Sequence, residues 1–363
     1  MTLEIHDYIQ PGRTAHLVGI GGVSMSPLAE VLHGAGVRIT GSDAHESGAV
    51  EHLRALGGRV AIGHLPESVE GADCVIRTAA VHDDNPEIAA ARRLGIPVFE
   101  RAQAWGAIMR HYHNALCVAG THGKTTTTSM CTHIFLAAGL DPTVMIGGTL
   151  PAIGSGYRVG KGETIILESC EYCNSFLSFF PTVAVILNVD ADHLDFFKDL
   201  EDVEHSFRRF AELVPVDTGV VVADRDDQNT METLAGLERP LITFGLEEGD
   251  VHAAGLEWVN GFPSFDIVFR GEKVTRVELQ VPGEHNVRNA LAAAAALALR
   301  VTVRGIREGL GAFRGAGRRF EHKGTYRGAQ VYDDYAHHPE ELRALLTMAQ
   351  SLGYGRVICA FQP

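Results

Sequence analysis

A glycine-rich segment, "AGTHGKTTTT", carries the clearest chemistry in this sequence, because it follows an apolar run and precedes a predicted helix. Glycines let backbone N–H groups turn towards phosphate oxygens, and a helix N-terminus adds partial positive charge. Lys124 can reach β- and γ-phosphates, and the Thr125 hydroxyl can bind Mg²⁺. The spacing G-x-x-G-K-T is shorter than the usual motif, because Val118 occupies the place of the first glycine. The segment predicts a triphosphate site, and the alternative is a glycine turn beside an exposed lysine.

Acidic residues follow two further apolar runs, in "IILESCEY" and "VILNVDADHLD". The first ends with Glu168 and Glu171, and the second includes His193. Ligands of parallel sheets bind at the carboxyl ends of strands, so both groups are predicted near the phosphate loop. Carboxylates and a histidine there suit Mg²⁺ beside ATP, and the alternative is solvated loop charge. Cys170 and Cys173 have C-x-x-C spacing, but without a second such pair a zinc site is not favoured.

A second glycine loop, "GIGGVSMS", follows the apolar run "AHLV" near the N-terminus. It almost matches the dinucleotide-binding pattern, with Ser24 in the place of the last glycine. Asp43, after the next predicted strand, stands where a ribose-binding carboxylate is expected. The pattern fits NAD, FAD or another nucleotide, and a tight turn without a ligand is the alternative. With a triphosphate site in the next domain, we favour a nucleotide-linked substrate.

Strands alternate with helices along most of the chain, which predicts α/β domains with parallel sheets. The expected domains are residues 1–110 for the substrate, 111–315 for ATP, and 316–363. Residues 251–281 alternate apolar and polar side chains around turns, which predicts a few antiparallel strands in the central domain. After a connector at 311–324, the last domain is predicted to contain a strand at 329–336, a helix at 338–353 and a strand at 356–361.

The composition limits the classes of function. The 363 residues have a formal net charge of −14, which argues against binding nucleic acid through a broad basic face. No uninterrupted apolar stretch of about 18 residues occurs, and the N-terminus lacks a signal-peptide pattern, so no membrane association is expected. Most of the six cysteines lie in apolar runs, as reduced thiols do, which favours a cytoplasmic location.

These motifs together resemble the Mur ligases of peptidoglycan synthesis, and the match extends over nearly the whole chain. It rests on "GIGGVSMSPLAEVL", "TGSD", "AGTHGKTTTT", "ESCEYCNSFL", "NVDADHLD", "GEHNVRNALAA", "GRRFE", "DDYAHHPEE" and "FQP". The resemblance implies a Rossmann-like N-terminal domain for a UDP-sugar, a P-loop ATPase-like central domain and a C-terminal α/β domain for the amino acid. It also implies formation of an amide from UDP-N-acetylmuramic acid and L-alanine, with ATP and Mg²⁺, through an acyl phosphate.

The resemblance assigns roles to individual residues. It implies that Lys124, Glu168, His193 and Arg319 are catalytic, and that Thr125, Glu168 and His193 bind Mg²⁺. The expected ATP-binding residues are Gly120, Thr121, His122, Gly123, Lys124, Thr125, Thr126, His285, Asn286, Asn289, Asp334 and His337. The expected UDP-sugar-binding residues are Gly19, Gly21, Gly22, Ser42, Asp43, Thr78 and Asn188.

The sequence departs from the family pattern in three places. No lysine lies between Lys198 and Lys273, whereas ligases that add later residues have a carbamylated lysine there, so the alanine-adding type is favoured. Cys170 and Cys173 replace acidic residues of many relatives, which leaves Glu168 and Glu171 as the predicted functional carboxylates. The family normally continues beyond "FQP" with arginines for the amino acid, so we expect a truncated C-terminal domain and poor ligation.

Three alternatives remain open from the sequence. A ligase that attaches a preformed, recycled peptide uses similar loops, and the amino-acid domain would distinguish it. Outside the class of enzymes, the alternative is a non-catalytic fragment that binds a UDP-sugar or ATP. An NAD-dependent oxidoreductase is less favoured, because it leaves Lys124 and Thr125 unexplained. A monomer and a homodimer are both compatible with the sequence.

Overall fold

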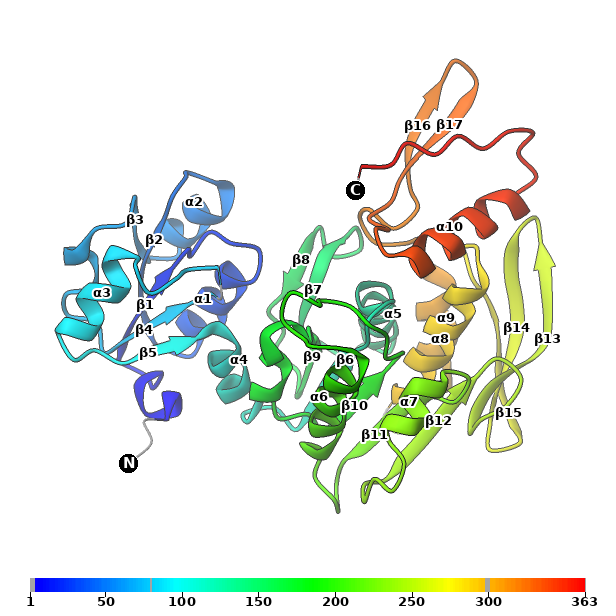
Figure 1. Ribbon diagram of the computed structural model, residues 1–363, viewed down its shortest axis with the longest axis horizontal. Helices are drawn as coiled ribbons and strands as arrows, with labels where there is room; N and C mark the ends of the chain where they lie inside the picture. Colours follow the sequence, from blue (N-terminus) through cyan, green and yellow to red (C-terminus); the bar gives the residue numbers. More distant parts are fainter. Residues whose placement is uncertain (1–3, 79, 298–300, 363) are drawn as a thin grey trace. The chain divides into compact units, whose positions relative to one another are not determined.

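The computed structural model describes residues 4–78, 80–297 and 301–362 (Figure 1). The chain forms two compact units. The first unit comprises Met1–His113 together with Cys173–Phe180, and the second comprises Asn114–Tyr172 and Pro181–Pro363. Both are α/β structures, as predicted from the alternation of strands and helices.

The first unit is built on a parallel sheet with the strand order β3-β2-β1-β4-β5. Its strands are β1 (Thr14–Val18), β2 (Arg38–Asp43), β3 (Arg59–Ile62), β4 (Cys74–Arg77) and β5 (Val98–Glu100). Its helices are α1 (Met25–Gly34), α2 (Gly48–Ala55), α3 (Pro86–Arg93), α4 (Arg101–Met109) and the short 3₁₀ helices η1 (Ile5–Tyr8) and η2 (Pro66–Val69). All five residues of β1 are buried, as expected for a central parallel strand covered on both faces.

The segment Cys173–Phe180 belongs to the first unit although it lies far along the chain. It contains most of the 3₁₀ segment η3 (Tyr172–Ser178). Its Phe176 is fully buried, and the guanidinium of Arg110 lies 3.9 Å from the ring centroid of Phe180. The first unit is therefore discontinuous in sequence.

The second unit contains a ten-stranded sheet with the order β15-β14-β13-β12-β11-β10-β6-β9-β7-β8. The strands are β6 (Asn114–Ala119), β7 (Thr143–Leu150), β8 (Ser155–Arg158), β9 (Thr164–Glu168), β10 (Val183–Ile186), β11 (Val220–Asp224), β12 (Leu241–Gly245), β13 (Val251–Val259), β14 (Phe262–Phe269) and β15 (Glu272–Glu278). Strands β6, β7, β9, β10, β11 and β12 pair in parallel, whereas β13, β14 and β15 form an antiparallel meander. The antiparallel strands predicted at 251–281 are thus confirmed.

The helices of this unit are α5 (Lys124–Ala137), α6 (Leu200–Glu212), α7 (Gln228–Thr233), α8 (Glu284–Leu297) and α9 (Val303–Ala312). Helix α5 has four threonines directly after its first residue, Lys124, and threonine is a poor helix former, so the helical state depends on burial and local hydrogen bonds. The Thr128 hydroxyl donates to the Lys124 carbonyl at 2.8 Å, and the Thr132 hydroxyl donates to the Thr128 carbonyl at 2.8 Å. No helix among the described residues is both long and apolar enough to cross a membrane.

The last part of the chain differs from the sequence-based prediction. Strands β16 (Glu321–Tyr326) and β17 (Ala329–Asp333) form a separate antiparallel hairpin, and α10 (Pro339–Ser351) follows. The predicted connector at 311–324 thus already contains the start of β16. The predicted strand at 356–361 was wrong, because these residues have no strand structure. A strand must form backbone hydrogen bonds with a neighbouring strand. Among the described residues, β17 pairs only with β16.

Candidate functional site

The phosphate loop connects the end of β6 to the start of α5. Gly123 precedes α5 with φ = +82°, a left-handed conformation that favours glycine. A Cβ atom there would lie 2.7 Å from Asn289 Oδ1, so a side chain would also collide with α8. The loop therefore needs glycine at this position both for its backbone turn and for the close approach of Asn289.

Asn188, which follows β10, holds the loop through its backbone. Its Oδ1 accepts from the His122 N–H at 2.7 Å, and its Nδ2 donates to the His122 carbonyl at 3.2 Å. The Thr121 hydroxyl accepts from the Asp190 N–H at 2.9 Å. Because the side-chain amide of Asn188 is occupied by the loop, we interpret Asn188 as a residue that positions the phosphate site.

Lys124 forms an ion pair with Glu171 inside this loop. Its Nζ lies 3.0 Å from both carboxylate oxygens of Glu171, and it also donates to the carbonyls of Gly120 and Thr121 at 2.5 and 3.1 Å. Burial opposes the charge on Lys124, but the nearby Glu171 outweighs it and raises the pKa of the ammonium group. The lysine is therefore charged, and its ion-pair partner is the carboxylate of Glu171.

Glu168 lies beside Thr125 because β9 pairs with β6, with Glu168 opposite Val118. The Thr125 hydroxyl donates to Glu168 Oε1 at 3.1 Å, and the Gly147 N–H donates to Glu168 Oε2 at 2.7 Å. A hydroxyl and a carboxylate are hard oxygen donors of the kind that Mg²⁺ prefers. These two predicted metal-binding residues are thus adjacent, and their chemistry fits the ion.

The third predicted metal-binding residue, His193, lies beside other acids. Its Nε2 is 3.8 Å from Glu171 Oε1 and 4.0 Å from Asp192 Oδ2, and the three side chains could hold a cation together. His193 has φ = +53°, and its N–H donates to Asp192 Oδ1 at 2.7 Å. This turn, which directs the imidazole towards Glu171, could not be foreseen from the sequence pattern.

The residues predicted on the adenine side lie at the start of α8. Asn289 Oδ1 accepts from the Thr127 hydroxyl at 3.2 Å, and Asn286 Nδ2 donates to the Pro282 carbonyl at 2.7 Å. Burial lowers the pKa of His285 to about 4, so its imidazole is neutral at physiological pH. Asn286 and Asn289 are nearly fully buried, whereas His285 is partly exposed. Asn289 joins α8 to the phosphate-loop helix through Thr127, and its Nδ2 donates to Asn286 Oδ1 at 3.3 Å.

The start of α10 reaches the phosphate loop. Glu341 Oε1 lies 3.3 Å from His122 Nδ1, and the N–H of His337 donates to Glu341 Oε2 at 3.2 Å. Although burial acts in the opposite direction, these hydrogen bonds lower the pKa of Glu341 to about 2. Asp334 accepts from the backbone N–H groups of Phe320 and Ala336 at 2.6 and 2.8 Å.

Arg319 lies next to this cluster, with its guanidinium 5.3 Å from the ring centroid of Tyr335. Burial raises the pKa of Asp334, while the charge of Arg319 acts in the opposite direction. Arg319 also contributes to the lowered pKa of Glu341. The structure therefore brings Arg319, Asp334 and His337 to the region of His122, and Thr126 follows in the first turn of α5.

In the first unit, the glycine loop lies between β1 and α1. Gly19 has φ = +76°, and the N–H groups of Gly19 and Ile20 both donate to the Ser42 carbonyl, at 2.8 and 2.9 Å. The Gly21 N–H donates to Asp43 Oδ2 at 2.8 Å, and the Gly22 N–H donates to the Gly19 carbonyl at 3.1 Å. Asp43 thus lies directly on the loop, as the dinucleotide-type pattern predicts for a ribose-binding acid.

Ser42 has a different environment from the one expected of a ligand-binding hydroxyl. It is fully buried, and its hydroxyl donates to Glu87 Oε2 at 2.5 Å. Glu87, also fully buried, contacts His16 Nε2 at 3.3 Å and His64 Nδ1 at 2.9 Å. Burial acts to raise the pKa of Glu87, but hydrogen bonds from His16, Ser42 and His64 lower it overall. Ser42 therefore holds the glycine loop in place through its carbonyl, which accepts from Gly19 and Ile20.

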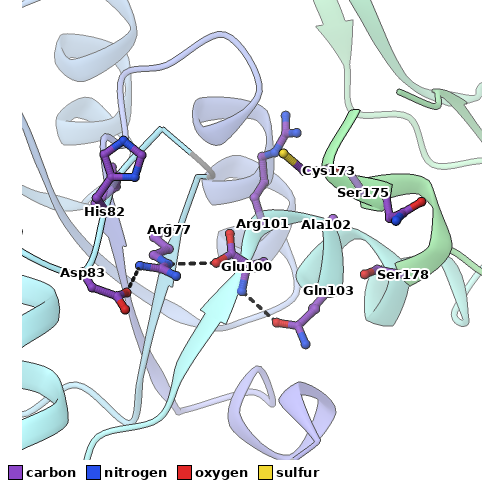
Figure 2. Close-up of a pocket in the computed structure, with 12 residues that line it drawn as sticks. Arg77, His82, Asp83, Glu100, Arg101, Ala102, Gln103, Cys173, Ser175 and Ser178 are labelled. Atoms are coloured by element: carbon purple, nitrogen blue, oxygen red, sulfur yellow. Dashed lines mark hydrogen bonds and ion pairs between the residues drawn. The ribbon is translucent and has the colours of Figure 1, made fainter. Parts of the chain in front are cut away.

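A cavity of about 590 Å³ opens in the first unit (Figure 2). Its lining includes Arg77, Arg101 and the cysteine of the η3 segment, Cys173. Arg77 donates to Glu100 Oε1 at 2.8 Å and to Asp83 Oδ1 at 2.6 Å, as the dashed lines of Figure 2 show. The Arg101 guanidinium donates to the Ser24 hydroxyl at the end of the glycine loop. The same positively charged side chain therefore lines the cavity and contacts the loop.

Sequence reasoning identified Thr78 in this region but missed Arg77 and Arg101. Arg77 ends β4, and the pattern of ligands at carboxyl ends of strands was a signal that could have identified it. Arg101 starts α4, and no local motif distinguishes it from a solvent-exposed arginine. Its relation to Ser24 depends on the fold, since the two residues are 77 positions apart.

The second unit thus combines a parallel sheet, a lysine-containing phosphate loop at a helix N-terminus, and carboxylates after a neighbouring strand. This arrangement defines an enzyme of the P-loop class that acts on a nucleoside triphosphate. The first unit adds a separate nucleotide-type loop with an acidic partner.

Comparison with family models identifies the family. The model described as "Mur ligase family, catalytic domain" matches residues 14–113, "Mur ligase middle domain" matches 118–297, and "Mur ligase, glutamate ligase domain" matches 318–363. UDP-N-acetylmuramate–L-alanine ligase of Clostridium novyi (strain NT) is 46% identical over 352 residues, which are 97% of this chain and 77% of that protein. The chain belongs to the Mur ligase family.

Other proteins support this assignment. The ligase of the same name from Caldanaerobacter subterraneus subsp. tengcongensis is 48% identical, over 96% of this chain and 76% of that protein. The crystal structure of UDP-N-acetylmuramate-alanine ligase MurC from Thermotoga maritima has a TM-score of 0.78 at 32% identity, covering 93% of this chain and 78% of that one. The crystal structure of UDP-N-acetylmuramate:L-alanyl-γ-D-glutamyl-meso-diaminopimelate ligase (MPL) from Neisseria meningitides has a TM-score of 0.76 at 30% identity, covering 84% of this chain and 99% of that one.

Proposed function

We propose that this chain is an ATP-dependent ligase that joins L-alanine to the lactyl carboxylate of UDP-N-acetylmuramic acid in the cytoplasm. The observation that carries the proposal is the Lys124–Glu171 ion pair at the N-terminus of α5, beside the Thr125–Glu168 contact. This site occurs in a chain that is 42–48% identical to several proteins named as ligases of that specificity.

The reaction needs charge neutralisation, because two anions must meet. An oxygen of the lactyl carboxylate attacks the γ-phosphorus of ATP, the bond to the β–γ bridging oxygen breaks, and ADP leaves. The L-alanine amine then attacks the acyl carbon, phosphate leaves, and the amine loses a proton as the amide forms. Positive charge fixed around the γ-phosphate stabilises the first transition state.

Lys124 supplies this charge by exchanging Glu171 for phosphate oxygens. The released Glu171 remains close to His193, and both can then bind a cation with Asp192. Thr125 and Glu168 would hold a first Mg²⁺ and His193 a second, and these ions would screen the phosphate charge. The N–H groups of Thr121 and His122 donate to Asn188, so those of Gly123 and Lys124, at the start of α5, would bind the remaining phosphate oxygens.

The other nucleotide contacts come from α8 and the last segment. His285, the partly exposed member of this group, is proposed to contact adenine, while Asn289, which is bonded to Asn286, positions α8 against α5. Arg319 is proposed to face the phosphates, and Asp334 and His337 to approach the nucleotide from the start of α10. Thr121 and His122 in the loop and Thr126 in the first turn of α5 are the remaining proposed ATP-binding residues.

The first unit is proposed to bind the UDP portion. Gly19, Gly21 and Gly22 allow a diphosphate to approach the backbone, and Asp43 accepts from a ribose hydroxyl through its remaining lone pairs. Arg101 bridges this loop and the Figure 2 cavity, so it is placed to bind a diphosphate. Thr78 follows Arg77 at the end of β4.

Mass spectrometry of the reaction product tests the proposal. The chain is incubated with UDP-N-acetylmuramic acid, ATP and Mg²⁺, with either L-alanine or the tripeptide L-alanyl-γ-D-glutamyl-meso-diaminopimelate. We expect a product that contains alanine, with ADP and phosphate released in equal amounts. A product only with the tripeptide would favour the peptide-attaching alternative, whose substrate is the one in the name of the Neisseria meningitides MPL ligase.

Calorimetry separates binding from catalysis in the same preparation. UDP-N-acetylmuramic acid should bind at one site in the presence of Mg²⁺ and a non-hydrolysable ATP analogue, and Arg101→Ala should weaken this binding. If the folded chain binds NADH and not the UDP-sugar, the assignment of the first unit is wrong.

A further inference from the structure

A group of possible metal ligands lies beside the phosphate loop, apart from Thr125 and Glu168. It consists of His122 in the loop, Asp190 after β10 and His338 just before α10. One ligand atom from each side chain lies within 4.8 Å of the other two. The His122 and His338 rings have centroids 4.6 Å apart, and His122 Nε2 is 3.9 Å from Asp190 Oδ2.

The orientation of His122 supports a ligand at its Nε2. The Glu341 carboxylate lies 3.3 Å from Nδ1 and can only accept, so it favours the tautomer with the proton on Nδ1. Nε2 then carries a lone pair, and it is buried without a hydrogen-bond partner. A histidine whose second nitrogen donates to a carboxylate is the common arrangement around protein-bound metals.

An Nε2 lone pair that faces a carboxylate oxygen is unfavourable unless a proton or a cation lies between them. His338 contributes a second imidazole at the same point, and its Nδ1 has only a long contact, 3.4 Å, from the Glu340 N–H. Two imidazoles and one carboxylate suit a transition metal, whereas Mg²⁺ prefers oxygen ligands.

We propose that His122, Asp190 and His338 form a binding site for a divalent transition metal of the zinc class. The three protein ligands leave a fourth position of a tetrahedral ion for water or a phosphate oxygen. The site is distinct from the proposed Mg²⁺ ligands Thr125, Glu168 and His193.

Metal binding here would link three segments that are far apart in sequence. His122 belongs to the phosphate loop, Asp190 to the turn after β10, and His338 to the N-terminus of α10. The ion would therefore fasten the last segment to the loop, so that zinc concentration would regulate how readily this segment leaves the nucleotide site.

Spectroscopic titration with Co²⁺ tests the site directly. The full chain is titrated in excess Mg²⁺, which occupies the oxygen-rich sites, and visible ligand-field absorption reports tetrahedral coordination. We expect one equivalent of Co²⁺ to bind without thiolate charge-transfer absorption, and Zn²⁺ to displace it. Thiolate absorption that disappears in Cys170→Ser or Cys173→Ser would overturn the proposal, because it would assign the ion to the cysteines.

Variants identify the ligands. His338→Asn keeps a side chain that can cap α10 but removes the imidazole, and Asp190→Asn removes the carboxylate. Each should weaken Co²⁺ binding at least about tenfold, while the neighbouring variant His337→Asn should bind like the unmodified chain. Unchanged binding in His338→Asn, with a melting temperature equal to that of the unmodified chain, would refute the site.

Discussion

The glycine loops of the two units share a backbone design and differ in the charged group behind them. Each follows a buried parallel strand, contains a glycine with φ near +80° (Gly19 at +76°, Gly123 at +82°) and leads into a helix. In the first loop the Gly21 N–H is already bound by Asp43, whereas the second loop contains Lys124 paired with Glu171. The glycines allow close approach of a ligand, but the charged residues determine which ligand.

Under the proposed function, this difference would let the two loops select different nucleotides. A carboxylate on the first loop accepts hydrogen bonds from hydroxyls, and Arg101, bound to Ser24 at the end of this loop, is the cation proposed to meet the diphosphate. A buried lysine in the second loop loses its carboxylate partner only when another anion replaces it. The first loop is thus suited to a ribose with a neighbouring diphosphate, and the second to a triphosphate.

Replacing the lysine should produce the largest effect. Lys124→Met should reduce ATP-dependent product formation by about 10³-fold or more, because the buried site would lose its main fixed positive charge. Binding of the UDP-sugar to the first unit should be retained in calorimetry. Lys161→Met, at an exposed position, is the matched control. Retention of substantial turnover in Lys124→Met would show that the second loop does not bind ATP in the proposed way.

Changing the acid of the first loop should have a smaller and separable effect. Asp43→Asn should raise the KM for UDP-N-acetylmuramic acid about 10- to 100-fold, because it weakens a charge-assisted hydrogen bond. Steady-state kinetics with each substrate varied should show an unchanged KM for ATP. The exposed Asp84→Asn is the control. An equal change in both KM values would contradict the division of ligands between the loops.

The buried Glu87, which binds the Ser42 hydroxyl behind the first loop, should affect the stability of the protein rather than its kinetics. Glu87→Gln should lower the free energy of unfolding by about 1–3 kcal/mol at pH 7, because a buried charged acceptor is lost. The pKa of Glu87 is lowered from 4.5, so its contribution is present above this pH and is lost as the pH falls through the folded-state value. The difference between the two proteins should therefore shrink in acid.

Thermal unfolding from pH 7 to pH 3 measures this effect. Glu70→Gln, at an exposed position, should change the melting temperature little at any pH. If Glu87→Gln were as stable as the unmodified chain at pH 7, the cluster behind Ser42 would not stabilise the first loop.

Features encoded by local spacing could be predicted from the sequence. The phosphate loop combines an apolar run, two glycines, Lys124 and Thr125, and this order is enough to place it between a strand and a helix. The position of Asp43 beside the first loop could be predicted in the same way, because the carboxyl end of β2 adjoins that of β1 in a parallel sheet.

Features that depend on distant partners could not be predicted. Residues 356–361 have a strand-like composition, but strand formation depends on an available partner and not on composition. Glu87 looks like an ordinary helix-start acid, and only the sheet brings His16 and His64 to its carboxylate. The position of Arg101 at the first loop likewise follows from its contact with Ser24, which is 77 positions away in the sequence.

The discontinuity of the first unit has a consequence for its synthesis. Ribosomes add about 5–20 residues per second, so Phe180 emerges several seconds after His113. During this interval the nascent first unit lacks Phe176, whose side chain is fully buried in the finished protein. An excised fragment that ends at His113 would have the same deficit permanently. Attempts to isolate this unit should therefore supply Cys173–Phe180 as well, by fusion through a short linker or as a separate peptide.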